Sequence, residues 1–349
     1  MKNPRLITFH NKIIKSVFIV AELSANHYHD VNIAKDTIKA AKESGADAIK
    51  LQTYTPDTIT IDCDNEYFQL KSGTIWDGQS LYGLYKKAYT PWEWHEELFE
   101  TAKNEGLICF STPFDFSAVD FLEKFDPPCY KIASFEITDI PLIEYVASKG
   151  KPIIMSTGIA TLADIERAVN ACRKVGNNEI TLLKCTSSYP APIEEANLLT
   201  IPHLKETFDV VPGLSDHTMG SSVAIAAVAL GAKIIEKHFI LDRNLGGPDS
   251  SFSMEPEEFK QMVESIRNVE KALGKINYDL TPKAKNSRVF TRSLFIVEDV
   301  KAGETVTENN VRSIRPGYGL HPMYLNEVMG KKFRKNISKG TPLDWRHIE

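Results

Sequence analysis

The chain has 349 residues, of which 42% are hydrophobic and 25% charged, so it can bury a large core in one large and one small domain or in two medium ones. Its formal net charge is −5 and it has no dense Lys/Arg run, which argues against a nucleic-acid partner and favours a small ligand. The cysteines are widely spaced without a Cys-x-x-Cys motif, and no apolar run approaches the roughly 20 residues of a membrane helix. We therefore expect a cytoplasmic protein with reduced thiols and no membrane partner.

Short β-rich apolar runs alternate with amphipathic helical patterns along most of the chain. The pattern predicts strands over Val17–Glu22, Ala48–Gln52, Leu107–Ser111, Tyr130–Ala133, Ile153–Ser156, Thr181–Cys185, Val210–Leu214 and Lys233–Lys237. It predicts helices over Asn32–Ser44, Trp92–Asn104, Phe116–Lys124, Ile140–Lys149, Leu162–Lys174, Leu198–Thr207, Gly220–Leu230 and Pro256–Leu273. Repeated β-then-α units of this kind predict an α/β fold, a (β/α)8 TIM barrel, with a doubly wound open sheet as the alternative.

One connection is unusually long. The stretch Thr53–Pro91 follows the second predicted strand and is polar and rich in aromatic residues. A βα loop of this length is uncommon unless it is functional, so we expect it to cover the active site.

The pattern changes near the end of the last predicted helix. We place the barrel in residues 1–276, a polar linker in 277–287 and a small domain in 288–349, where short strands and turns replace long helices. A domain of this size buries little core by itself, so we expect it to pack against something else.

Polar side chains follow the predicted strands where each apolar run stops. They are Glu22 and Asn26, Lys50 and Gln52, Ser111 and Thr112, Lys131 with Ser134 and Glu136, Ser156 and Thr157, Thr186 with Ser187, Ser188 and Tyr189, Ser215 with Asp216 and His217, then His238 and Asp249. The carboxyl ends of barrel strands converge on one face, where such folds carry their chemistry.

Two lysines, Lys50 and Lys131, belong to this set. A lysine at the end of an apolar strand needs an anionic partner, because an unpaired buried ammonium is costly. Surrounding hydroxyl groups favour a bound phosphate or carboxylate, whereas pairing with a nearby Asp or Glu is the alternative.

Two histidines, His217 and His238, each close an apolar run, and the helix Gly220–Leu230 separates the runs. On neighbouring parallel strands their imidazoles would lie together and could hold one divalent metal. The alternative is a pair of hydrogen-bonded structural histidines. Two imidazoles without nearby cysteine favour an open site that water and substrate complete. Glu22, Glu136 and Asp249 are candidates for acid/base chemistry or for contacts with sugar hydroxyls, and pairing with the lysines is their alternative role.

A set of motifs in chain order resembles the sialic acid synthases, which condense phosphoenolpyruvate with an amino sugar. The motifs are Ala21-Glu-Leu-Ser-Ala-Asn-His27, Gly45-Ala-Asp-Ala-Ile-Lys-Leu-Gln52, Phe110-Ser-Thr-Pro113, Tyr130-Lys-Ile-Ala-Ser134, Met155-Ser-Thr-Gly158, Lys184-Cys-Thr-Ser-Ser-Tyr-Pro190, Gly213-Leu-Ser-Asp-His217, Glu236-Lys-His238 and Gly247-Pro-Asp-Ser250. The C-terminal region, with Arg315-Pro-Gly317, resembles the antifreeze-like (SAF, β-clip) domain of the family. Within the family, Gln52-Thr-Tyr-Thr-Pro-Asp57 and Ala133-Ser-Phe-Glu-Ile-Thr138 resemble the pseudaminic acid synthases.

The resemblance implies a role for each matching residue. His217 and His238 resemble metal ligands, most often of Mn²⁺, with Mg²⁺ or Co²⁺ as alternatives. The residues that resemble a phosphoenolpyruvate shell are Lys50, Thr112, Lys131, Ser134, Ser156, Ser187 and Ser215. Those that resemble sugar contacts are Glu22, Gln52, Tyr189 and Asp249. Glu136 resembles the carboxylate that activates water, and Arg315 an arginine that enters the partner's active site in a homodimer with swapped C-terminal domains.

The implied function is a pseudaminic acid synthase acting on 2,4-diacetamido-2,4,6-trideoxy-L-altrose, with cleavage of the C–O bond of phosphoenolpyruvate. An N-acetylneuraminate or legionaminate synthase is the alternative within the family. A carbohydrate-binding protein without activity and a metal-dependent pyruvate aldolase are alternatives of other classes, and phosphate release during turnover separates both from a synthase.

Overall fold

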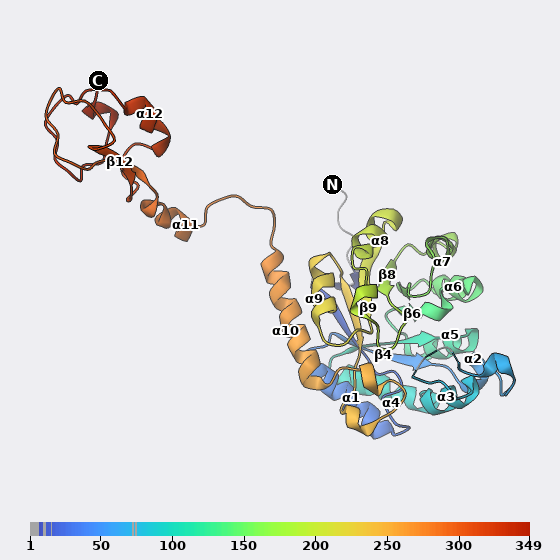
Figure 1. Cartoon of the computed structure of the whole chain (residues 1–349). Helices are drawn as coiled ribbons and strands as arrows, with labels where there is room; N and C mark the ends of the chain where they lie inside the picture. Colours follow the sequence, from blue (N-terminus) through green and yellow to red (C-terminus); the bar gives the residue numbers. More distant parts are fainter. Residues whose placement is uncertain (1–6, 10–11, 15, 72, 74) are drawn as a thin grey trace. The chain divides into compact units, whose positions relative to one another are not determined.

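In the computed structural model, residues 7–9, 12–14, 16–71, 73 and 75–349 are described. They form two compact units, which divide between Gly274 and Lys275. The first unit is a closed barrel of parallel strands surrounded by helices (Figure 1). The predicted (β/α)8 fold is therefore confirmed, and the open sheet is excluded.

The barrel strands follow one another in chain order around the ring until the last pairs with the first. Their bounds are β3 Phe18–Glu22, β4 Ala48–Thr53, β5 Ile108–Pro113, β6 Tyr130–Ile132, β7 Ile153–Ser156, β8 Ile180–Cys185, β9 Val211–Asp216 and β10 Ile234–His238. Each differs from its predicted range by no more than a few residues. A short antiparallel hairpin of β1 (Ile7–Phe9) and β2 (Lys12–Ile14) precedes the barrel and was not predicted.

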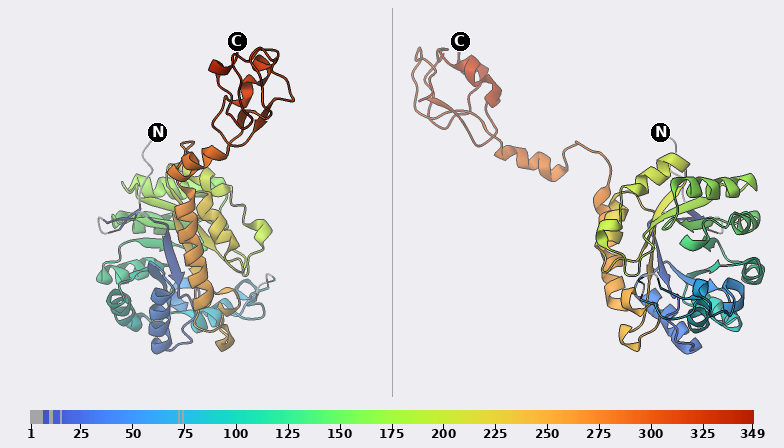
Figure 2. Two further views of the ribbon diagram at one scale, coloured as in Figure 1. Left: turned by 90° about the vertical axis from the view of Figure 1, so that its left-hand side faces the viewer. Right: turned by 45° about the vertical axis from the view of Figure 1, so that its right-hand side comes forward.

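Helices cover the outside of the barrel. They are α1 Val31–Glu43, α4 His95–Asn104, α5 Phe116–Leu122, α6 Ile140–Ser148, α7 Leu162–Lys174, α8 Thr200–Phe208, α9 Ser222–Ala229 and α10 Pro256–Leu273. Figure 2 shows α10 running along the barrel wall. Its buried face, which includes Phe259, Met262 and Ile266, packs in the same apolar cluster as Ile235 of β10.

The interior of the barrel changes character along its axis. Its lower layer is an apolar cluster of inward-facing side chains, Phe18, Val20, Ala48, Phe110, Cys129, Ile154, Leu183, Val211 and Ile234. Because side chains alternate along a strand, the residues two positions further on face the same interior. Those positions are polar in most strands, for example Glu22 after Val20 and Glu236 after Ile234. The alternation therefore places a layer of charged groups above the apolar one.

The long connection after β4 contains two short helices, α2 (Pro56–Ile59) and α3 (Leu81–Ala88). Thr55 caps the first and Ser80 the second through their side-chain oxygens. Only Leu84 and Ala88 of α3 are buried. The segment is thus more ordered than the predicted loop, because good caps stabilise helices too short to show a clear apolar period.

The second unit contains α11 (Pro282–Ser287), the antiparallel pair β11 (Ser293–Ile296) and β12 (Val311–Ile314), and α12 (Leu325–Val328). Helix α11 lies within the segment that the sequence indicated as a linker. The unit encloses a cluster of buried apolar side chains, among them Leu294, Val311 and Phe333. Its core is therefore larger than its length indicated. Across the described part of the chain, no helix is both long and apolar enough to span a membrane.

Gly213 in β9 is held between its two neighbouring strands. A Cβ atom at this position would lie 2.4 Å from Leu183 Cδ2 and 2.7 Å from the carbonyl oxygen of Ile234. A side chain here would push apart β8 and β10, since both neighbours belong to the fully packed interior.

We predict that Gly213→Ala lowers the free energy of unfolding by about 3 kcal/mol, because overpacking this layer displaces a neighbouring backbone. Gly220→Ala is the matched control: it has φ +73° and no heavy atom within 4 Å of its Cβ position, so only the backbone cost of about 1 kcal/mol applies. Urea unfolding followed by circular dichroism measures both. A loss at Gly213 no larger than at Gly220 would contradict this account of β9.

Candidate active site

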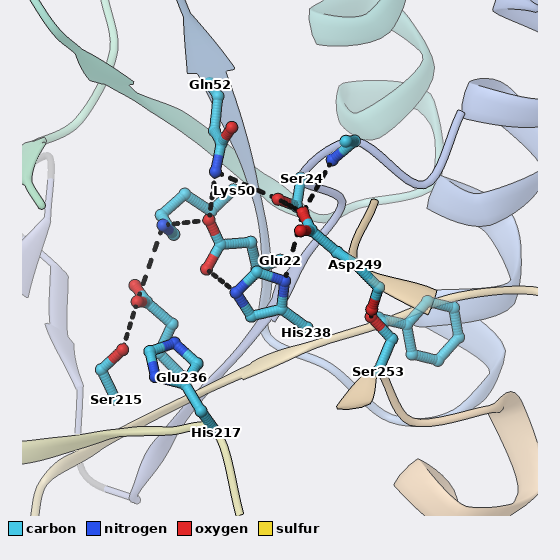
Figure 3. Close-up of polar contacts among 12 residues, drawn as sticks. Glu22, Ser24, Lys50, Gln52, Ser215, His217, Glu236, His238, Asp249 and Ser253 are labelled. Atoms are coloured by element: carbon cyan, nitrogen blue, oxygen red, sulfur yellow. Dashed lines mark hydrogen bonds and ion pairs between the residues drawn. The ribbon is translucent and has the colours of Figure 1, made fainter. Parts of the chain in front are cut away.

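The barrel brings a buried cluster of charged side chains together at the carboxyl ends of its strands (Figure 3). Lys50 donates to Glu22 Oε1 at 2.6 Å, and its Nζ lies 3.6 Å from Glu236 Oε1. Lys131 Nζ lies 3.4 Å from the same Glu236 oxygen. All four residues are fully or almost fully buried. The two lysines are therefore neutralised by two glutamates, which is the alternative that the sequence left open.

Glu22 connects this cluster to the histidine pair. Gln52 Nε2 donates to Glu22 Oε1 at 3.0 Å, and Glu22 Oε2 lies 3.3 Å from His238 Nε2. Burial by itself raises the pKa of Glu22, but the positive charges of Lys50 and Lys131 and the hydrogen bond from Lys50 hold it well below its usual value. Glu22 is therefore an anion at neutral pH.

His217 and His238 lie side by side, with ring centroids 5.3 Å apart. The Nδ1 atom of His217 lies 2.9 Å from the carbonyl oxygen of Thr186. This contact fixes the ring and leaves Nε2 as the atom available to a ligand. Nδ1 of His238 is buried and has no hydrogen-bond partner among the described residues. The predicted convergence of the two imidazoles is thus present.

The donor set fits a divalent metal ion of the open type. No group of three or more His, Cys, Asp or Glu side chains with the arrangement of a metal site occurs in the described ranges, so the protein would supply the two imidazoles and leave the remaining positions to water and substrate. Burial lowers the pKa of His238, which keeps its ring neutral and able to coordinate. Burial also opposes protonation of His217, but Cys185 and the Thr186 carbonyl raise its pKa to about 9. A metal would have to displace that proton.

Hydroxyl groups surround the same region. Ser134 Oγ accepts from the backbone N–H of Gly158 at 3.0 Å. A Cβ on Gly158 would lie 2.1 Å from Ser187 Oγ and 2.8 Å from Ser134 Oγ. Glycine is therefore required where β7 gives way to its loop, since any side chain would fill the space between these hydroxyls.

Several buried polar atoms at the strand ends have no hydrogen-bond partner in the described part of the chain. They are Thr112 Oγ1, Ser156 Oγ, Glu136 Oε2, Glu236 Oε2, His238 Nδ1 and, in the first loop, Asn26 Oδ1. Buried polar groups are almost always paired in folded proteins, so a group of unpaired ones indicates a ligand site. Four of these residues, Thr112, Ser156, Glu136 and His238, are predicted site residues.

Glu136 ends the short 3-10 turn Ser134–Glu136, which follows the strand of Lys131. Burial raises the pKa of its carboxyl to about 7, although Lys131 opposes the shift. A carboxyl with such a pKa can exchange a proton with a reacting group near neutral pH.

The sugar-side candidates form a second part of the site. Ser24 donates to Asp249 Oδ2, and Gln52 Nε2 donates to Ser24 Oγ at 3.1 Å. The ring of Tyr189 packs against the rings of His217 and Trp76, with centroid distances of 4.6 Å and 5.3 Å, respectively. The predicted barrel residues thus lie around one region, whereas Arg315 belongs to the second unit, exposed just after β12.

Sequence reasoning missed three residues of the site. Glu236, which bridges both lysines and accepts from Ser215 at 2.9 Å, had no role assigned to it. Its position two residues before His238 on a strand places both on one face, a signal that the sequence contained. Ser24 and Phe252 were also missed; Phe252 packs against His238 with centroids 4.9 Å apart, and neither residue lies on a strand.

Comparisons with known proteins show which proteins the chain resembles. The chain is 50% identical to the pseudaminic acid synthase of Campylobacter jejuni over 94% of its own length and 96% of the relative. It is 51% identical to the pseudaminic acid synthase of Helicobacter pylori, over 95% of this chain and 97% of that one. Among solved structures, an N-acetylneuraminic acid (sialic acid) synthetase from Leptospira borgpetersenii, in complex with citrate, superposes with a TM-score of 0.72 at 33% identity, covering 81% of this chain and 95% of that chain.

Two family models match the chain. The SAF domain matches residues 291–349, within the second unit. The NeuB family matches residues 37–278, which include all the barrel strands except β3. With relatives at about half identity along nearly the whole chain, this protein belongs to the NeuB family.

Proposed function

We propose that this enzyme condenses phosphoenolpyruvate with 2,4-diacetamido-2,4,6-trideoxy-L-altrose and releases pseudaminic acid and phosphate. Membership of the NeuB family and relatives named as nonulosonic acid synthases make it a synthase of the sialic acid type. The choice of sugar rests on the name that both half-identical relatives carry, pseudaminic acid synthase. Synthesis of N-acetylneuraminic or legionaminic acid is the alternative, and the solved relative named for N-acetylneuraminic acid is less similar, at 33% identity.

The observation that carries the proposal is the set of unpaired buried hydroxyls beside two lysines. Thr112 Oγ1 and Ser156 Oγ have no hydrogen-bond partner among the described residues. Lys131 lies on β6, between the strands of these two hydroxyls, and Lys50 lies on β4, beside the strand of Thr112. Phosphoenolpyruvate carries a phosphate and a carboxylate, which together offer enough acceptor oxygens for these donors. Ser134, Ser187 and Ser215 complete the proposed shell around the anion.

We propose that His217 and His238 hold a divalent metal ion, Mn²⁺ in the first instance. Such an ion supplies Lewis-acid polarisation of the sugar aldehyde. Glu22, Gln52, Tyr189 and Asp249 would orient the open-chain sugar beside it. The π electrons of the C2–C3 double bond of phosphoenolpyruvate form the new bond from C3 to the aldehyde carbon. The aldehyde π bond breaks, its oxygen takes up a proton from solvent, and positive charge develops at C2. Lys50 and Lys131 would donate hydrogen bonds to the phosphate and carboxylate throughout.

Water completes the reaction at C2. Glu136 is the base in this proposal, and it accepts one proton from the water that adds there. The bond from C2 to the bridging oxygen then breaks, the phosphate leaves with that oxygen, and the new hydroxyl on C2 loses its proton to solvent and becomes the keto group. The raised pKa of Glu136 suits this task, because a base titrating near neutral pH both holds and releases a proton readily.

The deoxy sugar presents a methyl group where N-acetylmannosamine carries a hydroxyl. Support for it comes from aromatic side chains in and beside the long connection after β4. Tyr54 is buried, with its ring 5.1 Å from Phe114 and 5.6 Å from Tyr85. Trp76 packs against Tyr189 and donates through its indole N–H to the carbonyl of Pro248 at 2.9 Å. This contact ties the connection to the loop that carries Asp249.

The proposal predicts phosphate release when the full chain, Mn²⁺ and phosphoenolpyruvate meet the altrose substrate. ¹⁸O in the bridging position should leave with the phosphate, and kcat/KM should be higher for this sugar than for N-acetylmannosamine or the legionaminate precursor. Chelation, His217→Ala or His238→Ala should lower turnover about 100-fold or more. Retention of the label in the sugar acid would overturn C–O cleavage. An equal or higher kcat/KM with N-acetylmannosamine would overturn the choice of sugar.

A second prediction follows from Glu136. Turnover should rise with pH through about 7 as its carboxyl loses a proton, and Glu136→Gln should remove both the rise and most of the activity. Asp139→Asn is the informative companion. Asp139 raises the pKa of Glu136 and also caps α6, and asparagine caps equally well. The pH profile of this variant should therefore shift to lower pH while the helix stays intact. An unshifted profile would assign the titration to another group.

We further propose that the enzyme is a homodimer in which Arg315 of one subunit completes the sugar site of the other. Arginine offers several donors in a rigid plane, which suits an acetamido carbonyl. Support for this comes from its exposure, from its place at the end of β12, where the Pro316 carbonyl accepts from Ser293, and from the match of its unit to the SAF domain.

Arg315→Ala should therefore raise the KM for the sugar about tenfold, with a smaller effect on phosphoenolpyruvate. Arg312→Ala, an exposed arginine on the same strand, should leave both unchanged. In mixed dimers of Arg315→Ala and His217→Ala subunits, one site would regain both residues and part of the activity should return. Exchanged heterodimers without recovery would mean that the arginine does not act across the dimer.

A further inference from the structure

The two strands that carry the histidines are tied together on both faces of the barrel wall. Ser215 of β9 and Glu236 of β10 are register partners, and their side chains are hydrogen-bonded at 2.9 Å in the interior. The next register pair, Asp216 and Lys237, forms an ion pair at 2.8 Å. Because successive side chains point to opposite faces of a strand, this ion pair lies on the outer face, towards the helices. His217 and His238 follow directly.

Lys237 reaches both sides of His217. Its ammonium donates to Asp216 Oδ2 at 2.8 Å and to the carbonyl oxygen of Thr218 at 2.6 Å. The other oxygen of Asp216 accepts from the backbone N–H of Thr218 at 2.9 Å and from its hydroxyl at 2.8 Å. We call these three residues, Asp216, Thr218 and Lys237, the Lys237 clamp. Its members precede and follow one histidine and precede the other, so the clamp fixes the backbone of both.

Stability alone is a poor explanation for the clamp. Its charged side chains are only 1% exposed, and replacing a buried ion pair by apolar residues of similar volume is often neutral or stabilising. On the same face of each strand, two residues before the clamp, Leu214 and Ile235 are apolar and pack in the cluster between strands and helices. A polar group at this point of an otherwise apolar layer restricts geometry, since a charged hydrogen-bond network admits fewer arrangements than apolar packing.

We propose that the Lys237 clamp positions His217 and His238 so that their imidazoles can share one divalent metal ion. This inference rests on the metal-dependent reaction proposed above. The clamp touches neither substrate nor metal; it acts through the histidines and is a positioning device. Interior contacts hold the rings themselves, as Thr186 does for His217. The clamp fixes the spacing between the two strand ends from which the rings project.

The test compares two double variants of the full chain. Asp216→Asn with Lys237→Met removes both charges, keeps the amide oxygen for Thr218 and keeps the volume of the lysine stem. The matched control removes a pair at the other end of the barrel, where Arg267 contacts Asp47 at 2.8 Å and Asp47 accepts from the backbone N–H of Ile19. Asp47→Asn with Arg267→Met should lower the melting temperature without touching the histidines.

Mn²⁺ binding to the metal-free proteins is then measured by calorimetric titration at a temperature where all are folded by circular dichroism. We expect at least about tenfold weaker Mn²⁺ binding in the clamp variant, as for other groups that orient metal ligands, and wild-type affinity in the control. Affinity within twofold of wild type in the clamp variant would overturn the proposal, and so would an equal loss in the control, which would point to general stability.

Two further outcomes are decisive. Wild-type protein that releases phosphate yet binds no Mn²⁺ would overturn the metal site and, with it, the clamp, while leaving the condensation reaction standing. A clamp double variant that does not fold is replaced by Lys237→Arg, which keeps the charge but displaces both contacts of the ammonium. Folded Lys237→Arg with wild-type Mn²⁺ affinity overturns the proposal, and a loss of about tenfold supports it.

Discussion

The pairing of β10 with β3 is the constraint on which the site depends. It closes the ring and sets His238 opposite Glu22 in register, so residues from the two ends of the barrel sequence become neighbours. In an open sheet these strands would lie on distant edges. The same closure brings Ser24, just after the first barrel strand, against Asp249, just after the last. The contact between the metal-ligand candidates and the charged cluster thus follows from closure, and no single motif contains it.

Alternation along the strands does the rest. Most strands place an apolar side chain low in the barrel and a polar one two residues later, so the interior is divided into layers. The cost of burying two lysines and two glutamates in the upper layer is offset by their mutual pairing. The pairing also fixes their positions, because Glu236 contacts both ammonium groups and Glu22 contacts one of them together with His238. The cluster has no net charge, so the site pre-arranges its donors without an unpaired charge in the interior.

Much of this architecture could be predicted from the sequence. Several barrel strands are continuous apolar runs, which occur when both faces of a strand are buried, and the polar ends of the strands marked one face of the barrel. The sequence places Glu236 on the same face as His238, but the partners of Glu236 and the Lys237 clamp could not be predicted, because the partner of a side chain depends on the register between β9 and β10. Helices α2 and α3 were not predicted because they are short and lack a clear apolar period. The size of the core of the second unit was not predicted because its short strands alternate with turns.

The apolar layer at the amino-terminal end of the barrel strands determines how ligands reach and leave the site. Phe18, Phe110 and Leu183 fill the interior below the charged cluster and are at most 1% exposed. The interior of the barrel is therefore closed at this end. Reactants, water and products all enter and leave at the carboxyl ends of the strands. Whatever binds deepest must enter first and leave last. A molecule bound above a ligand on Lys50 and Lys131 would block the exit of that ligand. The order of binding and release is therefore set by depth in the barrel.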